Sequence, residues 1–440
     1  MTRPPSWYTH HAMTRLTTLS TVLVVLSTSC IGTPMAWRPS GSAGQAGGAS
    51  AAPTVRGVTV GQNPGPIAVD SRTGRVFVVN RGSLDNGYGG SGNPLGTGAG
   101  SVSVLDATTG QVLRTQPVGR GPALIAVDER LGRVFVVNRG PFDPGTRAFS
   151  AHSTVSILDA ATGRLLHTAR LSTPAAMLIL VDQDRGRVVV VGLYDIEILD
   201  ALTGVVVRRL NEFAEFAALD ARADRLFLGD EGAVRTFRET TGARIATATI
   251  NDGTAASDER PFINALAVDE QAGHVIVSGG NDRSHLTTMR LLDARTGAQL
   301  HREDGQSAAG AAIGVDEAAA RAIIVRYPAG YESAYGNTAS YVAEVVDTRS
   351  GHIVASRTPP AFRRVALTVD QGHARAYLAL QPPIGHANDP GQVVVLDTRT
   401  GRVIRQVMIG KTAAGIVVDS LTGLVFVTDE SAGVVNILTR

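Results

Sequence analysis

Cysteine, tryptophan and lysine are almost missing from this sequence of 440 residues. With one cysteine, Cys30, the chain can form no internal disulfide, no cysteine zinc cluster and no C-x-x-C-H haem attachment. The two tryptophans, Trp7 and Trp37, precede the repeated region. The repeats therefore lack both a Trp-Asp signature and the tryptophan docking motif of quinone-cofactor dehydrogenases.

An excess of charge of one sign is also missing. The chain has 41 basic and 39 acidic residues, a net charge of +2. Removing Arg3 and Arg15, which lie in a predicted signal segment without acidic residues, leaves 39 of each sign. Neither a basic surface for nucleic acid nor a polybasic stripe for anionic lipid is indicated. The sequence predicts no nucleic-acid partner.

Motifs of common enzyme classes are missing as well. There is no Gly-x-Ser-x-Gly elbow, no Walker sequence and no His-x-x-x-His pair. Zinc or iron needs several converging ligands, whereas the ten histidines are scattered. The groups around His285 and His386 are interpreted as solvated turns. The sequence thus predicts no cofactor, no metal site and no catalytic residues.

A secretory signal is indicated at the N-terminus. Met13-Thr-Arg15 is a short basic start, and residues 16–26 are mostly apolar. The uninterrupted apolar part, residues 22–26, is far shorter than the roughly 20 residues that cross a bilayer. The segment ending at Cys30 resembles a bacterial lipobox, although Ser27 stands where that family usually has leucine. The alternative is an ordinary cleaved signal followed by an incidental free cysteine.

This resemblance implies lipidation at Cys30 and a place outside the cytoplasm, as a membrane-anchored bacterial lipoprotein of the periplasm or cell surface. Contact with the membrane would then be through the lipid anchor only. Residues 1–29 are predicted to be the signal peptide. Residues 30–54, rich in Gly, Ser and Ala, suit a flexible tether. Residues 55–440 are predicted to form one domain.

A repeat of about 50 residues fills that domain. Each copy has an apolar strand ending in aspartate, a short turn, a second strand, a variable loop, a third strand ending in aspartate, a Thr-Gly turn and a fourth strand. The first-strand aspartates are Asp70, Asp128, Asp182, Asp220, Asp269, Asp316, Asp370 and Asp419. This period is typical of four-stranded propeller blades, so the predicted fold class is an all-β β-propeller.

The ends of the array predict how the ring closes. The last copy stops after its third strand, and residues 55–61 form an additional strand before the first copy. Pairing of residues 55–61 with residues 433–440 would complete an eighth blade and remove two exposed edges. Because the fourth copy, residues 216–250, is short, seven blades is the alternative.

Phe135-Val-Val-Asn138 and Phe426-Val-Thr-Asp429, each followed by a strand like Val-Ser-Val-Leu-Asp, resemble the YVTN-type β-propeller repeat of bacterial and archaeal envelope proteins. The resemblance covers residues 55–440. It implies the fold, but its functions are diverse binding and surface roles, and related propellers include lactonases and quinoprotein dehydrogenases.

The Asp-x-x-Thr-Gly sequences are interpreted as hairpin caps rather than as metal or catalytic carboxylates. An aspartate can accept hydrogen bonds from backbone N–H groups further along the turn, and glycine adopts a positive φ. Their repetition supports a structural role, since a catalytic pair would occur once.

The loops between second and third strands are long and variable, so the face that carries them is the predicted binding face. Its predicted ligand-binding residues lie at or just after the ends of second strands: Asn80, Arg81, Asn138, Arg139, Arg326, Tyr327 and Asp429. Tyrosines gather nearby, at Tyr327, Tyr331, Tyr335 and Tyr341, which suits carbohydrate or protein contact. Coding bias in a GC-rich genome explains the arginine excess as well as ligand binding does.

The favoured function is an envelope-anchored, non-catalytic scaffold that binds an unidentified protein, glycan or small molecule. The alternative is a propeller hydrolase of lactonase type, acting at the mouth of the central channel. Convergent acidic, histidine and arginine side chains with perturbed pKa values at that mouth would support the enzyme.

Overall fold

The computed structural model describes residues 55–82, 84–85, 95–96, 98–143, 148–149, 152–192, 194–250, 261–281, 286–307, 310–327, 342–360, 362, 364–382 and 389–439. Cys30, the predicted signal peptide and the predicted tether lie outside the described residues. So do Tyr331, Tyr335, Tyr341, His285 and His386.

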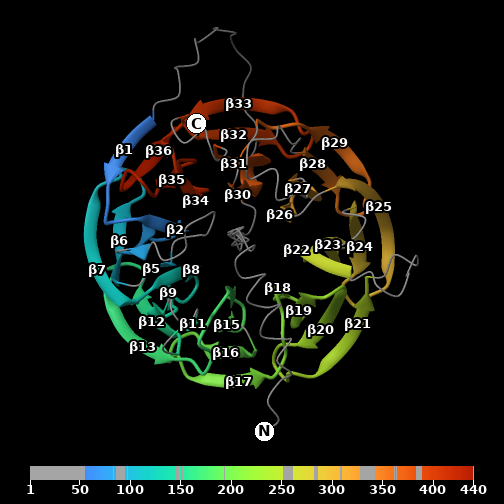
Figure 1. Ribbon diagram of the computed structural model, residues 1–440, viewed down its shortest axis with the longest axis horizontal. Helices are drawn as coiled ribbons and strands as arrows, with labels where there is room; N and C mark the ends of the chain where they lie inside the picture. Colours follow the sequence, from blue (N-terminus) through green and yellow to red (C-terminus); the bar gives the residue numbers. More distant parts are fainter. Residues whose placement is uncertain are drawn as a thin grey trace, which may run out of the picture.

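Eight four-stranded antiparallel sheets are arranged as blades in a ring, which confirms the predicted β-propeller (Figure 1). The blades follow one another in chain order. Blade 1 consists of β2 (Pro64–Asp70), β3 (Arg75–Asn80), β6 (Ala99–Asp106) and β7 (Val112–Arg120), and blade 2 of β8 (Pro122–Asp128), β9 (Arg133–Asn138), β12 (Thr154–Asp159) and β13 (Leu165–Arg170). Blade 3 consists of β14 (Leu178–Asp182), β15 (Arg187–Val191), β16 (Ile196–Asp200) and β17 (Val206–Leu210), and blade 4 of β18 (Phe216–Asp220), β19 (Arg225–Asp230), β20 (Ala233–Arg238) and β21 (Arg244–Thr249).

Blade 5 consists of β22 (Pro261–Asp269), β23 (His274–Asn281), β24 (Leu286–Asp293) and β25 (Gln299–Ser307), and blade 6 of β26 (Gly310–Asp316), β27 (Arg321–Tyr327), β28 (Val342–Asp347) and β29 (Ile353–Arg357). Blade 7 consists of β30 (Arg364–Asp370), β31 (Arg375–Gln381), β32 (Gln392–Asp397) and β33 (Val403–Met408), and blade 8 of β34 (Ala413–Val418), β35 (Val425–Asp429), β36 (Val434–Leu438) and β1 (Val55–Thr59). Short pairs β4 (Leu84–Asp85) with β5 (Leu95–Gly96), and β10 (Phe142–Asp143) with β11 (Ala148–Phe149), lie in the loops of blades 1 and 2. A 3-10 turn, η2 (Gln371–His373), joins β30 to β31.

The N-terminal strand closes the ring, as the sequence predicts. Strand β1 pairs antiparallel with β36, Val55 opposite Leu438 and Thr59 opposite Val434. The Val60 N–H extends the pairing by donating to the Gly433 carbonyl at 2.9 Å. The short fourth copy forms a complete blade, β18 to β21, so the alternative of seven blades is wrong.

The core is divided into eight apolar clusters, one between each pair of neighbouring blades. Between blades 8 and 1, for example, Ile67 and Val78 pack with Phe426 and Ile437. The remaining seven clusters join the other neighbours round the ring in the same way. Valine and isoleucine suit this arrangement because their branched side chains fill the space between pleated sheets.

The aspartates cap their turns, as predicted. After the third strand of blade 1, Asp106 accepts the Thr109 N–H at 2.8 Å and the Thr109 hydroxyl at 3.0 Å. These bonds, the backbone bond above all, lower the pKa of Asp106. Gly110 closes the turn at φ +68°, a conformation that favours glycine. Asp159, Asp200, Asp293, Asp347 and Asp397 accept equivalent bonds.

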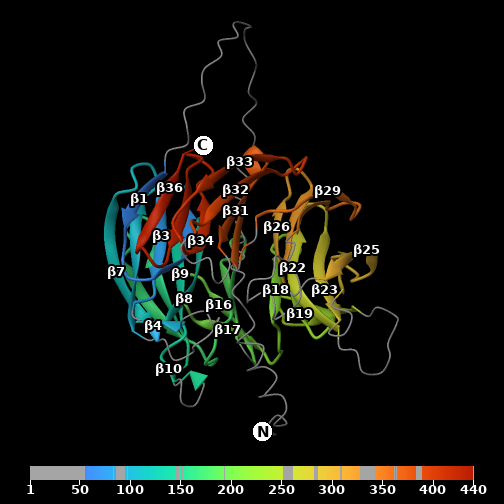
Figure 2. The ribbon, with the colours of Figure 1, turned by 45° about the horizontal axis from the view of Figure 1, so that its top comes forward.

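Strand direction gives the ring two different faces (Figure 2). The turns between first and second strands and between third and fourth strands lie on one face, called here the short-turn face. The loops between second and third strands and the crossovers between blades lie on the other, called here the long-loop face. No helix among the described residues is long and apolar enough to span a membrane.

Candidate functional site

The predicted binding residues lie where the sequence analysis expects them along the chain. Strands β3, β9, β27 and β35 end at Asn80, Asn138, Tyr327 and Asp429 on the long-loop face. The side chains of the predicted binding residues have different roles, however. Asn80, Asn138 and Asp429 hold the backbone, Arg326 lies in a buried ion pair, and Arg81 and Arg139 form a pair of arginines. Of Tyr327 only the backbone placement in β27 is described.

Asn80, Asn138 and Asp429 anchor the crossovers between blades. The Gly61 N–H donates to the Asn80 side-chain oxygen at 3.1 Å, and the Asn80 amide donates to Ser103 at 2.9 Å. The Asn138 amide donates in the same way to Ser156 at 3.0 Å. All three side chains are buried and contribute to the stability of the fold. That they also contact a ligand stays a prediction.

Glycine makes room for each anchor. A Cβ added at Gly61 or Gly119 would come within 2.5 Å or 2.7 Å of the Asn80 or Asn138 side chain. At Gly410 it would lie 1.5 Å from Asp429 Oδ2. Any side chain there would displace the anchor.

Arg326 lies in a buried ion pair. Its Nη2 is 3.0 Å from Glu344 Oε2, and both side chains are nearly inaccessible to solvent. Burial lowers the pKa of Arg326 and raises that of Glu344, because removal from water disfavours both charged forms. This pair joins β27 to β28 within blade 6. Because it is buried, the Arg326 guanidinium is poorly accessible to a binding partner.

Arg81 and Arg139 bring two positive charges together on the long-loop face. Arg81 Nη1 donates to Glu430 of blade 8 at 2.8 Å, and Gly65 lies directly beneath its guanidinium. Arg139, half-buried, donates through Nε to the Ala176 carbonyl of blade 3 at 2.7 Å. The two residues thus occupy the same position in neighbouring blades and tie those blades to others.

Arg139 has no carboxylate partner among the described residues. Burial lowers its pKa to about 10, and the nearby Arg81 charge acts in the same direction. Glu430 compensates only one of the two guanidinium charges. A desolvated, uncompensated cation attracts an anion, and guanidinium groups bind carboxylates or phosphates through paired hydrogen bonds.

The short-turn face carries charges that the sequence analysis did not expect. Side chains following the first-strand aspartates accept hydrogen bonds from the preceding blade. Glu129 accepts from the Ser71 N–H at 3.1 Å, Glu270 from the Ala221 N–H at 3.3 Å, and Glu317 from the Glu270 N–H at 3.1 Å. The signal is the dipeptide Asp-Glu, repeated at residues 128–129, 269–270 and 316–317.

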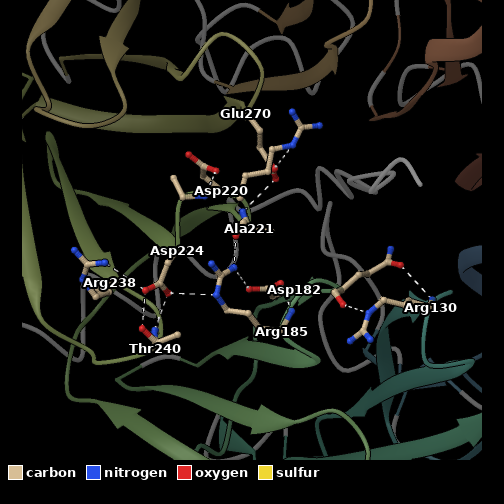
Figure 3. A network of polar contacts seen from close by, with 12 residues as sticks. Arg130, Asp182, Arg185, Asp220, Ala221, Asp224, Arg238, Thr240 and Glu270 are labelled. Atoms are coloured by element: carbon tan, nitrogen blue, oxygen red, sulfur yellow. Dashed lines mark hydrogen bonds and ion pairs between the residues drawn. The ribbon is translucent and has the colours of Figure 1, made fainter. Parts of the chain in front are cut away.

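A polar network continues this arrangement across blades 3 to 6, and Figure 3 shows the part of it around Arg185 and Asp224. Arg185 lies between Asp182 and Asp224, with Nη1 3.0 Å from Asp182 Oδ2, and also donates to the Ala221 carbonyl. Asp224 in turn accepts from the Thr240 N–H at 2.9 Å. Arg222 reaches Glu270 at 3.5 Å and Glu317 at 3.7 Å.

Two carboxyl groups of this region have strongly raised pKa values. Burial raises the pKa of Glu239 to about 8, helped by its position against the buried Asp182. Two ionised carboxylates cannot hydrogen-bond to each other, whereas a protonated Glu239 can donate to Asp182. Burial also raises the pKa of Glu270 to about 7, despite the hydrogen bond from Ala221.

Comparison with known proteins gives the fold and no family. No known family description matches the chain, and no curated protein matches its sequence. Among solved structures, the chain is similar to the C-terminal WD40 domain of Sif2, with a TM-score of 0.57 and 10% identity over 88% of this chain and 98% of that one. The chain is therefore an eight-bladed β-propeller with a WD40 propeller as a structural neighbour.

Proposed function

We propose that this propeller is a non-catalytic binding scaffold that receives an anionic group of a partner, such as an acidic peptide, at Arg81 and Arg139 on the long-loop face. The observation that carries the proposal is the half-buried Arg139 guanidinium, whose neighbouring charge is another guanidinium. A carboxylate placed between the two arginines would balance the charge that Glu430 leaves uncompensated.

The rigidity of the site supports this role. Arg81 is fixed across the junction of blades 8 and 1, and Arg139 across that of blades 2 and 3. Groups held in place before binding lose little conformational entropy when a partner arrives. Propellers offer such fixed rims, but the function lies in the residues that a particular rim presents.

Binding of an array of Asp- and Glu-containing peptides, with the matching Asn and Gln peptides as blanks, would test the proposal. We expect acidic peptides to bind and Arg139→Glu or Arg81→Glu to weaken binding more than about tenfold, since paired charges at interfaces couple strongly. Arg114→Glu, on an exposed outer strand, is the matched control. Loss of binding in the Arg114 variant, with the rim variants unaffected, would place the partner on the blade sides.

A second candidate function is a hydrolase of lactonase type at the short-turn face. Glu270, with a pKa raised to about 7 and Arg222 beside it, has the protonation behaviour of a general acid or base near neutral pH. Turnover of a lactone and ester panel that is lost in Glu270→Gln, but kept in Arg139→Glu, would favour this enzyme over the scaffold.

Membership of the YVTN-type repeat family and anchoring through Cys30 belong to the proposal as well. Strand β1 begins at Val55, opposite the end of β36, so residue 55 lies at the short-turn face. A tether attached there would direct the long-loop face away from the membrane, toward partners. Palmitate labelling in a bacterial host tests the anchor: label lost in Cys30→Ala supports it, and equal labelling of both forms contradicts it.

A further inference from the structure

Three side chains that commonly bind metal ions meet between blades 5 and 6. His301 and Glu303 come from the outer strand β25, and His352 follows the turn after β28. His301 Nε2 is 3.1 Å from Glu303 Oε2, and the rings of His301 and His352 lie 4.5 Å apart, edge to face. One donor atom from each residue lies within 4.8 Å of the others.

The fold brings these donors together through strand alternation and a glycine. Residues two apart on β25 share a face, so His301 and Glu303 both point toward blade 6 and are half-buried, while Arg302 and Asp304 face solvent. Gly351, at φ +81°, lies against the His301 ring, and a Cβ there would come within 2.6 Å of it. The missing side chain lets His352 approach.

Another junction of the ring has the same frame without the donors. His167 on β13 pairs with Ile157 just before a bulge, as His301 pairs with Leu291, and Gly204 of blade 3 lies against His167. There, however, Ala169 takes the place of Glu303, and Val205 the place of His352. A histidine therefore packs against a turn glycine at that junction although no second histidine and no carboxylate occupy the equivalent positions.

We propose that His301, Glu303 and His352 bind a zinc ion. Two imidazoles and one carboxylate form a three-ligand zinc set that leaves a fourth position for water. Ligands around a tetrahedral zinc ion lie roughly 3.3–3.6 Å apart, given bonds of about 2.0–2.2 Å. The donors already lie within 4.8 Å of one another, so zinc binding requires a small approach, which the exposed His352 side chain has room to make.

The site goes beyond the proposed scaffold function, since it lies at the outer side of the ring and uses neither Arg81 nor Arg139. It also departs from the expectation of no metal. That expectation rested on the missing His-x-x-x-His spacing, which cannot reveal ligands supplied by two blades. Zinc here would link β25 to the neighbouring blade at their outer edge.

Titration of the untagged, chelator-treated chain with Zn²⁺ by calorimetry, and with Co²⁺ followed by visible absorption, tests the site. We expect one ion per chain and a tetrahedral cobalt spectrum. Loss of a residue that only orients a ligand costs about 10- to 100-fold in affinity, so His301→Ala, His352→Ala and Glu303→Gln should each exceed that loss. His167→Ala is the matched control and should bind as the unaltered chain does.

Circular dichroism of each variant confirms that the ring is folded, and Glu303→Gln preserves the shape of the side chain. The proposal is overturned if the unaltered chain binds no stoichiometric zinc. It is equally overturned if the His301 and His352 variants keep full affinity, or if His167→Ala removes binding. Because acidic-peptide binding is measured separately, failure of the zinc site leaves the scaffold proposal standing.

Discussion

The hydroxyl of Thr348 donates a 2.5 Å hydrogen bond to the buried carboxylate of Asp269 in the preceding blade. Thr398 does the same for Asp316. Each threonine follows a third-strand aspartate. The backbone N–H of each donates to a carbonyl in the turn between the first and second strands of its own blade. Asp269 and Asp316 therefore cap their own turns with one oxygen and join neighbouring blades with the other.

Alanine replaces this threonine in blades 1, 2, 3 and 5, at Ala107, Ala160, Ala201 and Ala294. In blades 2 and 3 the missing hydroxyl leaves a carboxylate oxygen of the preceding blade unsatisfied. Ala160 and Ala201 make the equivalent backbone bonds, and Oδ2 of Asp70 and of Asp128 is buried without a hydrogen-bond partner among the described residues. We expect Ala160→Thr and Ala201→Thr each to raise the free energy of unfolding by about 0.5–1.5 kcal/mol, measured by urea denaturation.

Ala107→Thr is the control for these variants, because Oδ2 of Asp419 already accepts from Thr422 at 2.6 Å. It should give no gain. The reverse change, Thr348→Val, removes the hydroxyl at constant shape and should cost about 1–3 kcal/mol by leaving Asp269 unsatisfied. Equal effects of all three threonine substitutions would contradict this explanation.

Stability should fall as the pH rises from about 5 to about 8. Glu239 keeps its proton in the folded protein up to a pKa of about 8, while the unfolded chain releases it near the ordinary value of 4.5. The unfolded state thus binds fewer protons across this window, and the free energy of unfolding decreases with pH. Glu270, with a pKa of about 7, adds to the same slope.

Glu239→Gln should flatten this dependence and raise the melting temperature at pH 8, since an amide donates to Asp182 at every pH. Asp184→Asn, at an exposed residue of the neighbouring blade 3, is the control and should leave the slope unchanged. Scanning calorimetry at several pH values makes the measurement. A steep slope that persists in Glu239→Gln would show that other groups cause it.

Ring closure can be tested by comparing chains that begin at residue 55 and at residue 62. The shorter chain lacks β1 and exposes β36 as an unpaired edge. We expect it to be less stable by several kcal/mol or to aggregate, as measured by thermal unfolding and light scattering. Identical melting temperatures would mean that β1 contributes nothing to closure.

Gly119→Ala should destabilise the protein by about 1–3 kcal/mol, because a Cβ at this position meets the Asn138 side chain at 2.7 Å in a packed crossover. Gly57→Ala is the control, since the nearest atom to a Cβ there is 3.9 Å away. Urea denaturation of both variants compares them directly. Equal stability of the two variants would show that the crossover adjusts freely.

The repeats made the fold predictable from the sequence, whereas the contacts between blades could not be predicted from it. The regular aspartates predict the strands, the turns and the blade number, because each caps a turn within its own repeat. Asn80 and Asn138 look like ligand donors in sequence, yet they pack against Gly61 and Gly119 of the crossovers, each 19 residues earlier in the chain, and Asn80 accepts the Gly61 N–H. The zinc ligands likewise come from separate blades, and sequence spacing within one blade cannot detect them.

The composite eighth blade also determines when the domain can finish folding. Blades 1 to 7 consist of contiguous residues, so a chain emerging N-terminus first can assemble them in turn. Strand β1 emerges before all of them and pairs with β36, which emerges last. Until then the assembled blades form an open arc with two uncovered apolar faces and an unpaired strand at its start. We expect the slow, non-local closure of this arc to be the stage most exposed to proteases and aggregation.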